Sequence, residues 1–115
     1  MLPLLPLWKK KYIQALCYPI ARGARPAGMI GAATRELAEV KEVIQTSGCC
    51  SYTERRPSGY HVYIYKEAEV LERIKRKPLL SESEQYHRYM GQLFGYGDKY
   101  IDEFIQQLKS KRAFQ

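Results

Sequence analysis

The chain has 115 residues, of which 45% are hydrophobic and 27% are charged, and its formal net charge at pH 7 is +7. This length fits one domain, and the composition is that of an ordinary globular protein, which argues against a largely disordered chain. The positive charge favours phosphates, acidic proteins or anionic membrane surfaces as partners. Three cysteines without a Cys-x-x-Cys spacing argue against a secreted disulfide framework and against a zinc site, so we expect reduced thiols, a cytoplasmic location and no metal.

The N-terminal segment MLPLLPLWKKK is apolar at its start and basic at its end. The apolar run is too short for a membrane span, and its charges follow it, whereas those of a signal peptide precede it. We expect residues 1–11 to form an extended arm that docks on this chain or on a second copy. We expect residues 12–115 to form a single α+β domain. The candidate contact residues of the arm are Leu4, Leu5, Leu7 and Trp8.

Two segments of uncertain structure follow the arm. Residues 12–20, YIQALCYPI, fit either a strand or a short helix, and residues 21–31 read as a basic loop with three glycines. A helix is then predicted over residues 32–46, because its apolar side chains recur at helical spacing on one face. Those side chains are Ala33, Leu37, Val40 and Ile44.

The basic loop contains Arg25-Pro-Ala-Gly28, which resembles the Arg-x-x-Gly-x-Gly/Ala pyrophosphate loop of acetyltransferases related to histone acetylases. Ile30 stands in the place of the second small residue of that motif. The resemblance implies a strand before the loop, a helix after it and acetyl-CoA lying across it. It therefore implies an acyl-CoA or nucleotide-binding enzyme, which we rank third among the possible functions. For the segment itself, a flexible basic connector is favoured over a pyrophosphate loop.

A β-hairpin is predicted over residues 49–66, where two strand-like runs flank the turn-forming Pro-Ser-Gly. Val62 and Ile64 point to one face of the second strand, and alternation places its ring-bearing side chains on the other face. Those side chains are His61, Tyr63 and Tyr65. Depending on the register, the first strand adds either Tyr52 and Arg56 or Thr53 and Arg55 to this aromatic face.

Tyrosines beside arginines on an open sheet suit single-stranded nucleic acid, since each stacked base contributes ~1–3 kcal/mol and the cations hold the backbone. Tyrosine is also favoured in strands because it packs well on a pleated surface, so we expect a covered or interface-forming face more than a base-stacking one. The candidate nucleic-acid-binding residues are Arg22, Arg25, Tyr52, Arg55, Arg56, His61, Tyr63 and Tyr65.

The C-terminal half is predicted to be helical. A helix over residues 67–77 ends before Pro78, and the capping-box pattern Ser81-Glu-Ser-Glu84 opens a second one. Gly91 and the Gly-Tyr-Gly after it predict a tight corner, and Asp98 is the predicted cap of the last helix. A hairpin or three-stranded antiparallel sheet packed against three or four helices makes an α+β fold.

The sequence carries no catalytic signature and no cofactor motif. Glu84 lies three residues before His87, a spacing that allows a carboxylate–imidazole contact, but nothing places a nucleophile beside them. We therefore expect a binding protein without a cofactor rather than an enzyme, contacting RNA or DNA through the hairpin face and the basic N-terminal segment. The alternative is a protein-interaction or homo-oligomerisation module that uses the apolar arm.

Overall fold

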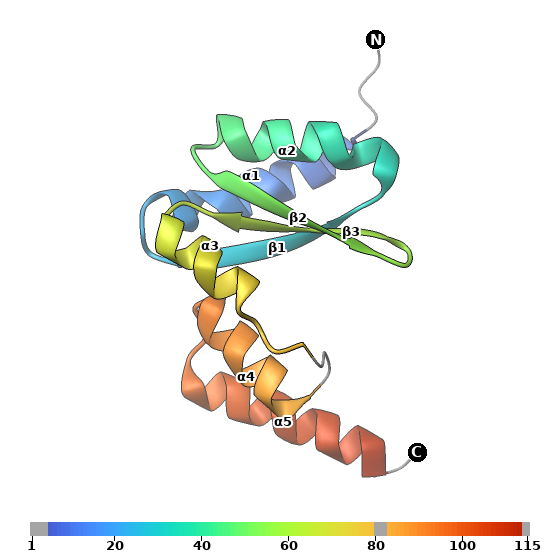
Figure 1. The fold of residues 1–115 in the computed structure, drawn as a ribbon, viewed down its shortest axis with the longest axis vertical. Coiled ribbons are helices and arrows are strands. Elements are labelled where there is room, and N and C mark those ends of the chain that lie inside the picture. Colours follow the sequence, from blue (N-terminus) through green and yellow to red (C-terminus); the bar gives the residue numbers. More distant parts are fainter. Residues whose placement is uncertain (1–4, 80–82, 114–115) are drawn as a thin grey trace.

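The structure is a computed structural model that describes residues 5–79 and 83–113, and it consists of a three-stranded antiparallel sheet with helices on both faces (Figure 1). The strands lie in the order β1–β3–β2. The α+β class and the helical C-terminal half predicted from the sequence are confirmed. The elements are α1 (Leu7–Ala21), β1 (Ala27–Ala32), a 3-10 turn (Thr34–Glu36), α2 (Leu37–Thr46), β2 (Cys50–Arg56), β3 (Gly59–Tyr65), α3 (Ala68–Lys75), α4 (Glu84–Leu93) and α5 (Asp98–Ala113).

Helices α1 and α2 cover one face of the sheet (Figure 1). Ile13, Cys17 and Ile20 recur at helical spacing on α1 and are buried against Val62 and Ile64 of β3. Burial of this stripe explains why residues 12–20, whose pattern fitted a strand or a helix, are helical.

The extended arm predicted for residues 1–11 is wrong from Leu7 onward, because α1 begins there. Pro6 precedes the first helical residue, where its missing amide costs no helical hydrogen bond. Its carbonyl accepts from the amides of Lys9 and Lys10 at 3.1 and 3.0 Å. Leu5 is buried in the core between α1 and α2, whereas Leu4 lies outside the described residues.

The basic loop predicted for residues 21–31 is also shorter than expected, because Ala27–Ala32 forms strand β1. Gly28 pairs with Ile64, and Ile30 pairs with Val62. A Cβ atom at Gly28 would stand 3.1 Å from the Leu16 side chain, so the small residue lets α1 approach the strand closely. This third strand supplies the partner that an isolated hairpin needs for stability.

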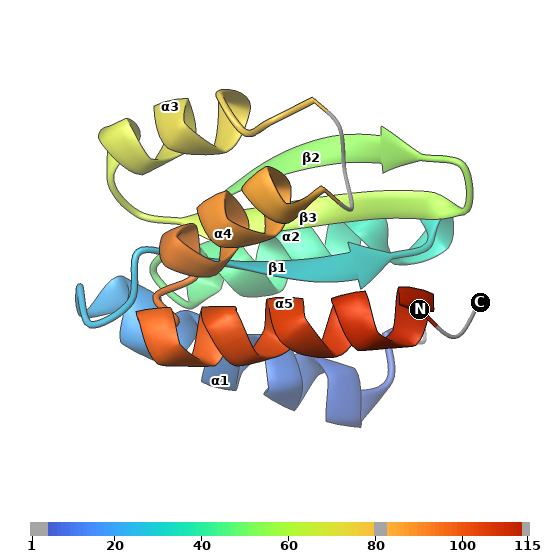
Figure 2. The same cartoon turned by 90° about the horizontal axis from the view of Figure 1, so that it is seen from below.

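The β2–β3 hairpin forms as predicted, and its register places Tyr52 opposite Tyr63 and Glu54 opposite His61. The aromatic face therefore gains Tyr52 and Arg56, not Thr53 and Arg55. This face is packed against the C-terminal helices (Figure 2), and Tyr63 is fully buried among Val70, Ile74, Met90 and Leu93. The expectation that a helix covers this face is confirmed at Tyr63.

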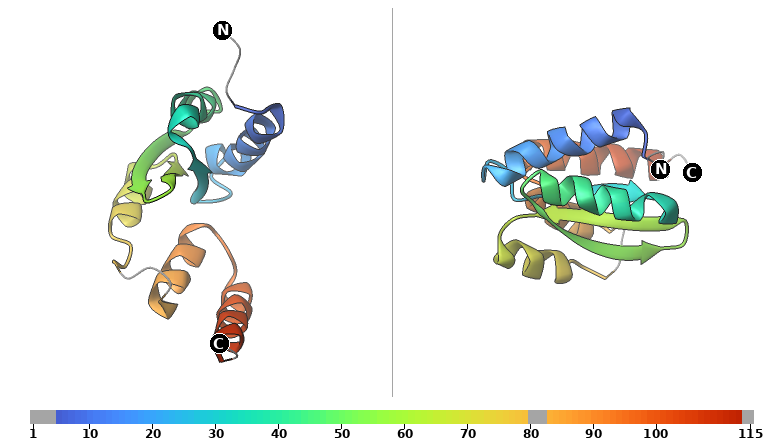
Figure 3. Two further views of the ribbon diagram at one scale, coloured as in Figure 1. Left: turned by 90° about the vertical axis from the view of Figure 1, so that its right-hand side faces the viewer. Right: turned by 90° about the horizontal axis from the view of Figure 1, so that it is seen from above.

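The α4–α5 pair extends beyond the sheet and lengthens the molecule to 49 × 31 × 24 Å (Figure 3). Ser83 caps α4, its hydroxyl accepting from the amide of Tyr86 at 3.1 Å, while the predicted cap at Ser81 lies outside the described residues. The corner contains Gly95 at φ +83°, a conformation that favours glycine. Gly91 faces Ile101 of α5, and this contact locks the two helices together.

Candidate functional site

Cationic side chains from three separate parts of the chain gather around the β2–β3 turn. Arg55 and Arg56 come from the end of β2, Lys75 and Lys77 from the end of α3 and the residues after it, and Arg35 from the 3-10 turn. They line two cavities of about 480 Å³ each, and both cavities share Arg55 and Arg56. The two cavities therefore adjoin along the edge strand β2.

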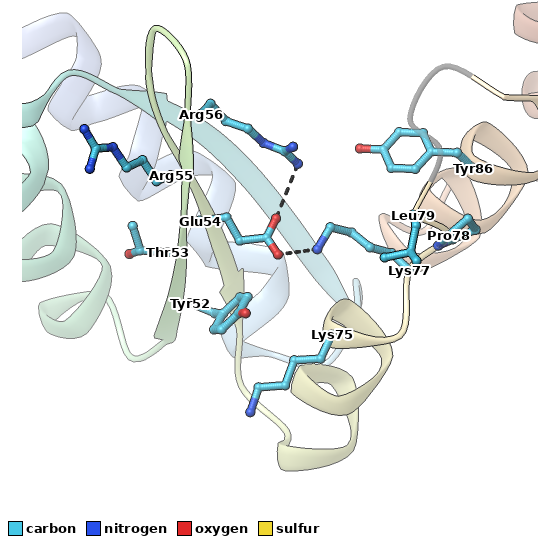
Figure 4. Close-up of a pocket in the computed structure, with 10 residues that line it drawn as sticks. All are labelled: Tyr52, Thr53, Glu54, Arg55, Arg56, Lys75, Lys77, Pro78, Leu79 and Tyr86. Carbon is cyan, nitrogen blue, oxygen red and sulfur yellow. Dashed lines mark hydrogen bonds and ion pairs between the residues drawn. The ribbon is translucent and has the colours of Figure 1, made fainter.

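The first cavity lies between β2 and the segment that follows α3 (Figure 4). Its ten lining residues include four cations and a single carboxylate, Glu54. Glu54 is bound by Arg56 at 3.3 Å and by Lys77, so two of the cations are paired. Lys75 lies 5.8 Å from the centre of the Tyr52 ring and, like Arg55, points away from Glu54.

The second cavity lies between the 3-10 turn and the hairpin turn. Its lining consists of Arg35, Arg55 and Arg56 together with uncharged residues around Pro57 and Tyr60, and none of the nine is acidic. Three guanidinium groups around one hollow create a positive field that attracts anions. We call the surface of both cavities the hairpin surface, formed by Arg35, Tyr52, Arg55, Arg56, Tyr60, Lys75 and Lys77.

His61 supports the hairpin surface from within the sheet. Arg56 Nε donates a hydrogen bond to His61 Nδ1 at 3.2 Å, which requires that this nitrogen carry no proton. Burial lowers the pKa of His61 below its ordinary value of 6.5, and the nearby Arg56 guanidinium lowers it further. His61 is therefore neutral at pH 7, and its role is to orient Arg56 rather than to add a charge.

The structure brings together Tyr52, Arg55, Arg56 and His61 but separates Arg22 and Arg25 from them. Ala27, which follows the two N-terminal arginines, pairs with Tyr65 at the far end of β3 from the turn. The length of β1 alone, about 17 Å at ~3.4 Å per residue, separates the two ends. Strand β1 therefore places the hairpin and the N-terminal arginines at opposite ends of the sheet.

Arg22 and Arg25 both contact other residues of this chain. The Arg22 guanidinium lies 3.5 Å above the centre of the Tyr18 ring. Arg25 Nε donates a hydrogen bond to the Phe94 carbonyl at 2.6 Å, and its guanidinium lies 5.4 Å from the Tyr96 ring. Arg25 thus holds the α4–α5 corner against the start of β1, which is a structural role.

Two of the residues predicted to stack on bases, Tyr63 and Tyr65, instead pack against apolar side chains of the protein. Tyr63 is fully buried, so its ring cannot meet a base, and burial raises its pKa to about 12. Tyr65 is half-buried against the same cluster of apolar residues. The rings that line the cavities are instead those of Tyr52, Tyr60 and Tyr86, and the last two were not among the predicted site residues.

Sequence reasoning also missed Arg35, Lys75 and Lys77. The run Lys75-Arg76-Lys77 was a visible basic signal, but its place beside β2 depends on how α3 packs against the sheet. Arg35 offered no local signal, since its place depends on how the 3-10 turn packs beside the hairpin turn.

The fold gives little support to a pyrophosphate loop at residues 25–31 or to a catalytic pair of Glu84 and His87. Arg25–Gly31 is not a loop between a strand and a helix: α1 precedes it, and most of it belongs to β1. His87 packs edge-on against Tyr86 and Phe104, and Glu84 is paired with Lys109 at 2.7 Å and with Arg88 at 3.5 Å. In residues 5–79 and 83–113, no group of three or more His, Cys, Asp or Glu side chains could hold a metal ion.

The fold and the site define a small α+β protein with a cationic surface at one end of its sheet. No family model matches the chain, and neither the curated proteins nor the solved structures contain a match. Within the described part of the chain, no helix is long and apolar enough to cross a membrane.

Proposed function

We propose that this chain binds single-stranded nucleic acid, RNA or DNA, at the hairpin surface. The observation that carries the proposal is the pair of adjoining cavities, whose lining together contains five cations, one carboxylate and three tyrosines. A cytoplasmic location is part of the proposal, and it is supported by the three cysteines, which are all free thiols.

The mixture of rings and cations favours nucleic acid over an acidic peptide. A peptide carboxylate needs only the arginines and lysines, whereas a nucleotide offers a phosphate for the cation and a flat base for the ring. Tyr52 and Tyr86 enter the first cavity from β2 and from α4 (Figure 4). Tyr60 borders the second cavity. A single strand suits this arrangement because its bases are free to stack on protein rings.

Fluorescence anisotropy with labelled oligo-U and oligo-dU of about ten nucleotides, a length within the usual site size, tests the proposal. Arg55→Ala and Lys75→Ala remove exposed cations of the hairpin surface, whereas Lys41→Ala removes an exposed cation from α2. We expect the first two to weaken binding and to reduce the salt slope by roughly 0.7–0.9 per lost phosphate contact. Lys41→Ala should leave both quantities almost unchanged.

Two results would overturn the proposal. The first is an affinity that does not fall as salt rises, because phosphate contacts release counterions. The second is an equal loss of affinity in Lys41→Ala and Arg55→Ala, which would assign binding to net charge instead of to this site. A comparison of oligo-U with oligo-dU, which differ only in the 2′-hydroxyl, decides between RNA and DNA.

A further inference from the structure

Helix α1 carries apolar and aromatic side chains on both of its sides. Ile13, Cys17 and Ile20 are buried against the sheet, while Leu7, Trp8, Tyr12 and Tyr18 are 66%, 69%, 55% and 60% exposed. Large apolar and aromatic side chains that are exposed together on one surface indicate a binding site. We call the exposed side the outer α1 face, formed by Leu7, Trp8, Lys11, Tyr12, Tyr18 and Arg22.

The outer α1 face is also positively charged. Helix α1 contains no acidic residue, and the Arg22 guanidinium is stacked on Tyr18 at 3.5 Å. Neither Lys11 nor Arg22 has a carboxylate partner among the described residues. The neighbouring carboxylates lie to the sides of this face: Glu36 pairs with Lys9 at 2.9 Å, and Glu39 and Glu42 line a cavity between α1 and α2 together with Lys10.

We propose that the outer α1 face docks on an anionic phospholipid bilayer. Tryptophan and tyrosine are favoured at the headgroup level of a membrane, and leucine beside them enters the acyl boundary. Lysine and arginine on the same face attract the negative lipid headgroups. The helix lies on the outside of the molecule (Figure 3), and the apolar and aromatic side chains of its outer face are all more than half exposed.

Charge and apolarity favour this occupant over two others. A second copy would bring two cationic faces together in a two-fold contact, with no acid on α1 to balance them. Nucleic acid could stack on the rings and pair its phosphates with the cations, but it has no large apolar surface to cover Leu7. The first seven residues, which lead into this face in the sequence, carry no polar side chain at all.

The only tryptophan of the chain is Trp8, so its fluorescence reports directly on this face. We expect its emission to shift to the blue with vesicles of phosphatidylcholine and phosphatidylserine, and far less with phosphatidylcholine alone. In co-sedimentation, Lys11→Gln should lower partitioning onto the anionic vesicles about fivefold. Trp8→Ala and Tyr12→Ala should lower it roughly tenfold or more by removing the inserted ring.

Matched variants distinguish vesicle binding by the outer α1 face from vesicle binding by other charged sites of the molecule. Lys41→Gln on α2 makes the same charge change as Lys11→Gln at another exposed site and should leave partitioning almost unchanged. Arg55→Ala should also bind vesicles normally, so the lipid proposal and the nucleic-acid proposal can fail separately.

Three outcomes would overturn the lipid proposal. Trp8 emission that does not respond to anionic vesicles would show that no bilayer covers the face. A blue shift produced by oligonucleotides but not by vesicles would assign the face to nucleic acid. Emission that shifts with protein concentration in the absence of lipid would assign it to a second copy of the chain.

Discussion

Arg25 Nε donates a hydrogen bond of 2.6 Å to the carbonyl oxygen of Phe94, which ties the start of β1 to the corner between α4 and α5. The Arg25 side chain also packs against Gly95, where a Cβ atom would lie 3.2 Å from Arg25 Cγ. We expect Arg25→Ala to lower the free energy of unfolding by about 1.5–3 kcal/mol, because a hydrogen bond from a charged donor is lost. Urea denaturation measures this change.

Arg22→Ala is the matched control for Arg25→Ala. Arg22 is exposed and stacks on Tyr18 at the surface, so its removal should cost less than about 1 kcal/mol. Both variants should bind oligonucleotides nearly as well as the natural chain, because both residues lie at the opposite end of the sheet from the hairpin surface. A large loss of affinity in Arg25→Ala without a loss of stability would contradict the structural role.

Gly91 of α4 and Ile101 of α5 are in contact too close for a larger residue. A Cβ atom at position 91 would lie 2.8 Å from Ile101 Cγ1 and 2.9 Å from Cδ1, and Ile101 is itself buried. We expect Gly91→Ala to destabilise the chain by about 1–2 kcal/mol, since overpacking outweighs the ~1 kcal/mol that alanine gains over glycine in a helix. Thermal unfolding followed by circular dichroism tests the sign.

Gly97→Ala provides the comparison for Gly91→Ala. No atom lies within 4 Å of a Cβ placed at Gly97, and its φ lies outside the left-handed region. This substitution should change the free energy of unfolding by less than about 1 kcal/mol, because alanine restricts the unfolded chain but is less favourable than glycine at the N-cap, where the Gly97 carbonyl accepts from the Ile101 amide at 3.1 Å. Equal destabilisation by both substitutions would mean that the corner needs glycine for its backbone and not for helix contact.

The neutral His61 makes stability depend on pH. Its pKa is lowered in the folded chain, so the unfolded chain binds the proton more readily, and stability is lost as pH falls below 6.5. Urea midpoints between pH 7.5 and 5 should fall in the natural chain and fall less in His61→Gln. Glu36, whose pKa is lowered by the Ala33 amide and by Lys9, loses its contribution only below its ordinary value of 4.5. A pH profile that is the same in both chains would exclude His61 as the cause.

The sequence predicted the elements whose pattern is strong and local. The alternation of residues 60–65 identified the hairpin, and the stripe through Ile101 and Ile105 identified α5. Strand β1 was not predicted because AGMIGA is rich in glycine and alanine, which are uncommon in strands. Its strand structure depends on pairing with β3 and on packing against Leu16. Helix α1 was ambiguous because it is apolar on both sides.

The candidate site was only partly predictable for a different reason. Its cations come from the 3-10 turn, β2 and the end of α3, which meet only after the chain has folded. The register of the hairpin decided that Arg56 joins the aromatic face, and the position of α3 and α4 decided that Tyr63 is buried. Neither fact is encoded in the alternation of one strand.

Glu54 neutralises part of the positive charge of the hairpin surface, since it binds both Arg56 and Lys77. We expect Glu54→Gln to raise the affinity for oligonucleotides, because it releases two cations, and to steepen the salt slope by roughly 0.7–0.9 for each new phosphate contact. Glu42→Gln makes the same charge change on α2, away from the hairpin, and should have little effect. Salt titrations followed by fluorescence anisotropy compare the two variants. If Glu54→Gln weakens binding while the chain stays folded, Glu54 holds Arg56 and Lys77 in the geometry that the ligand needs, and the simple charge argument fails.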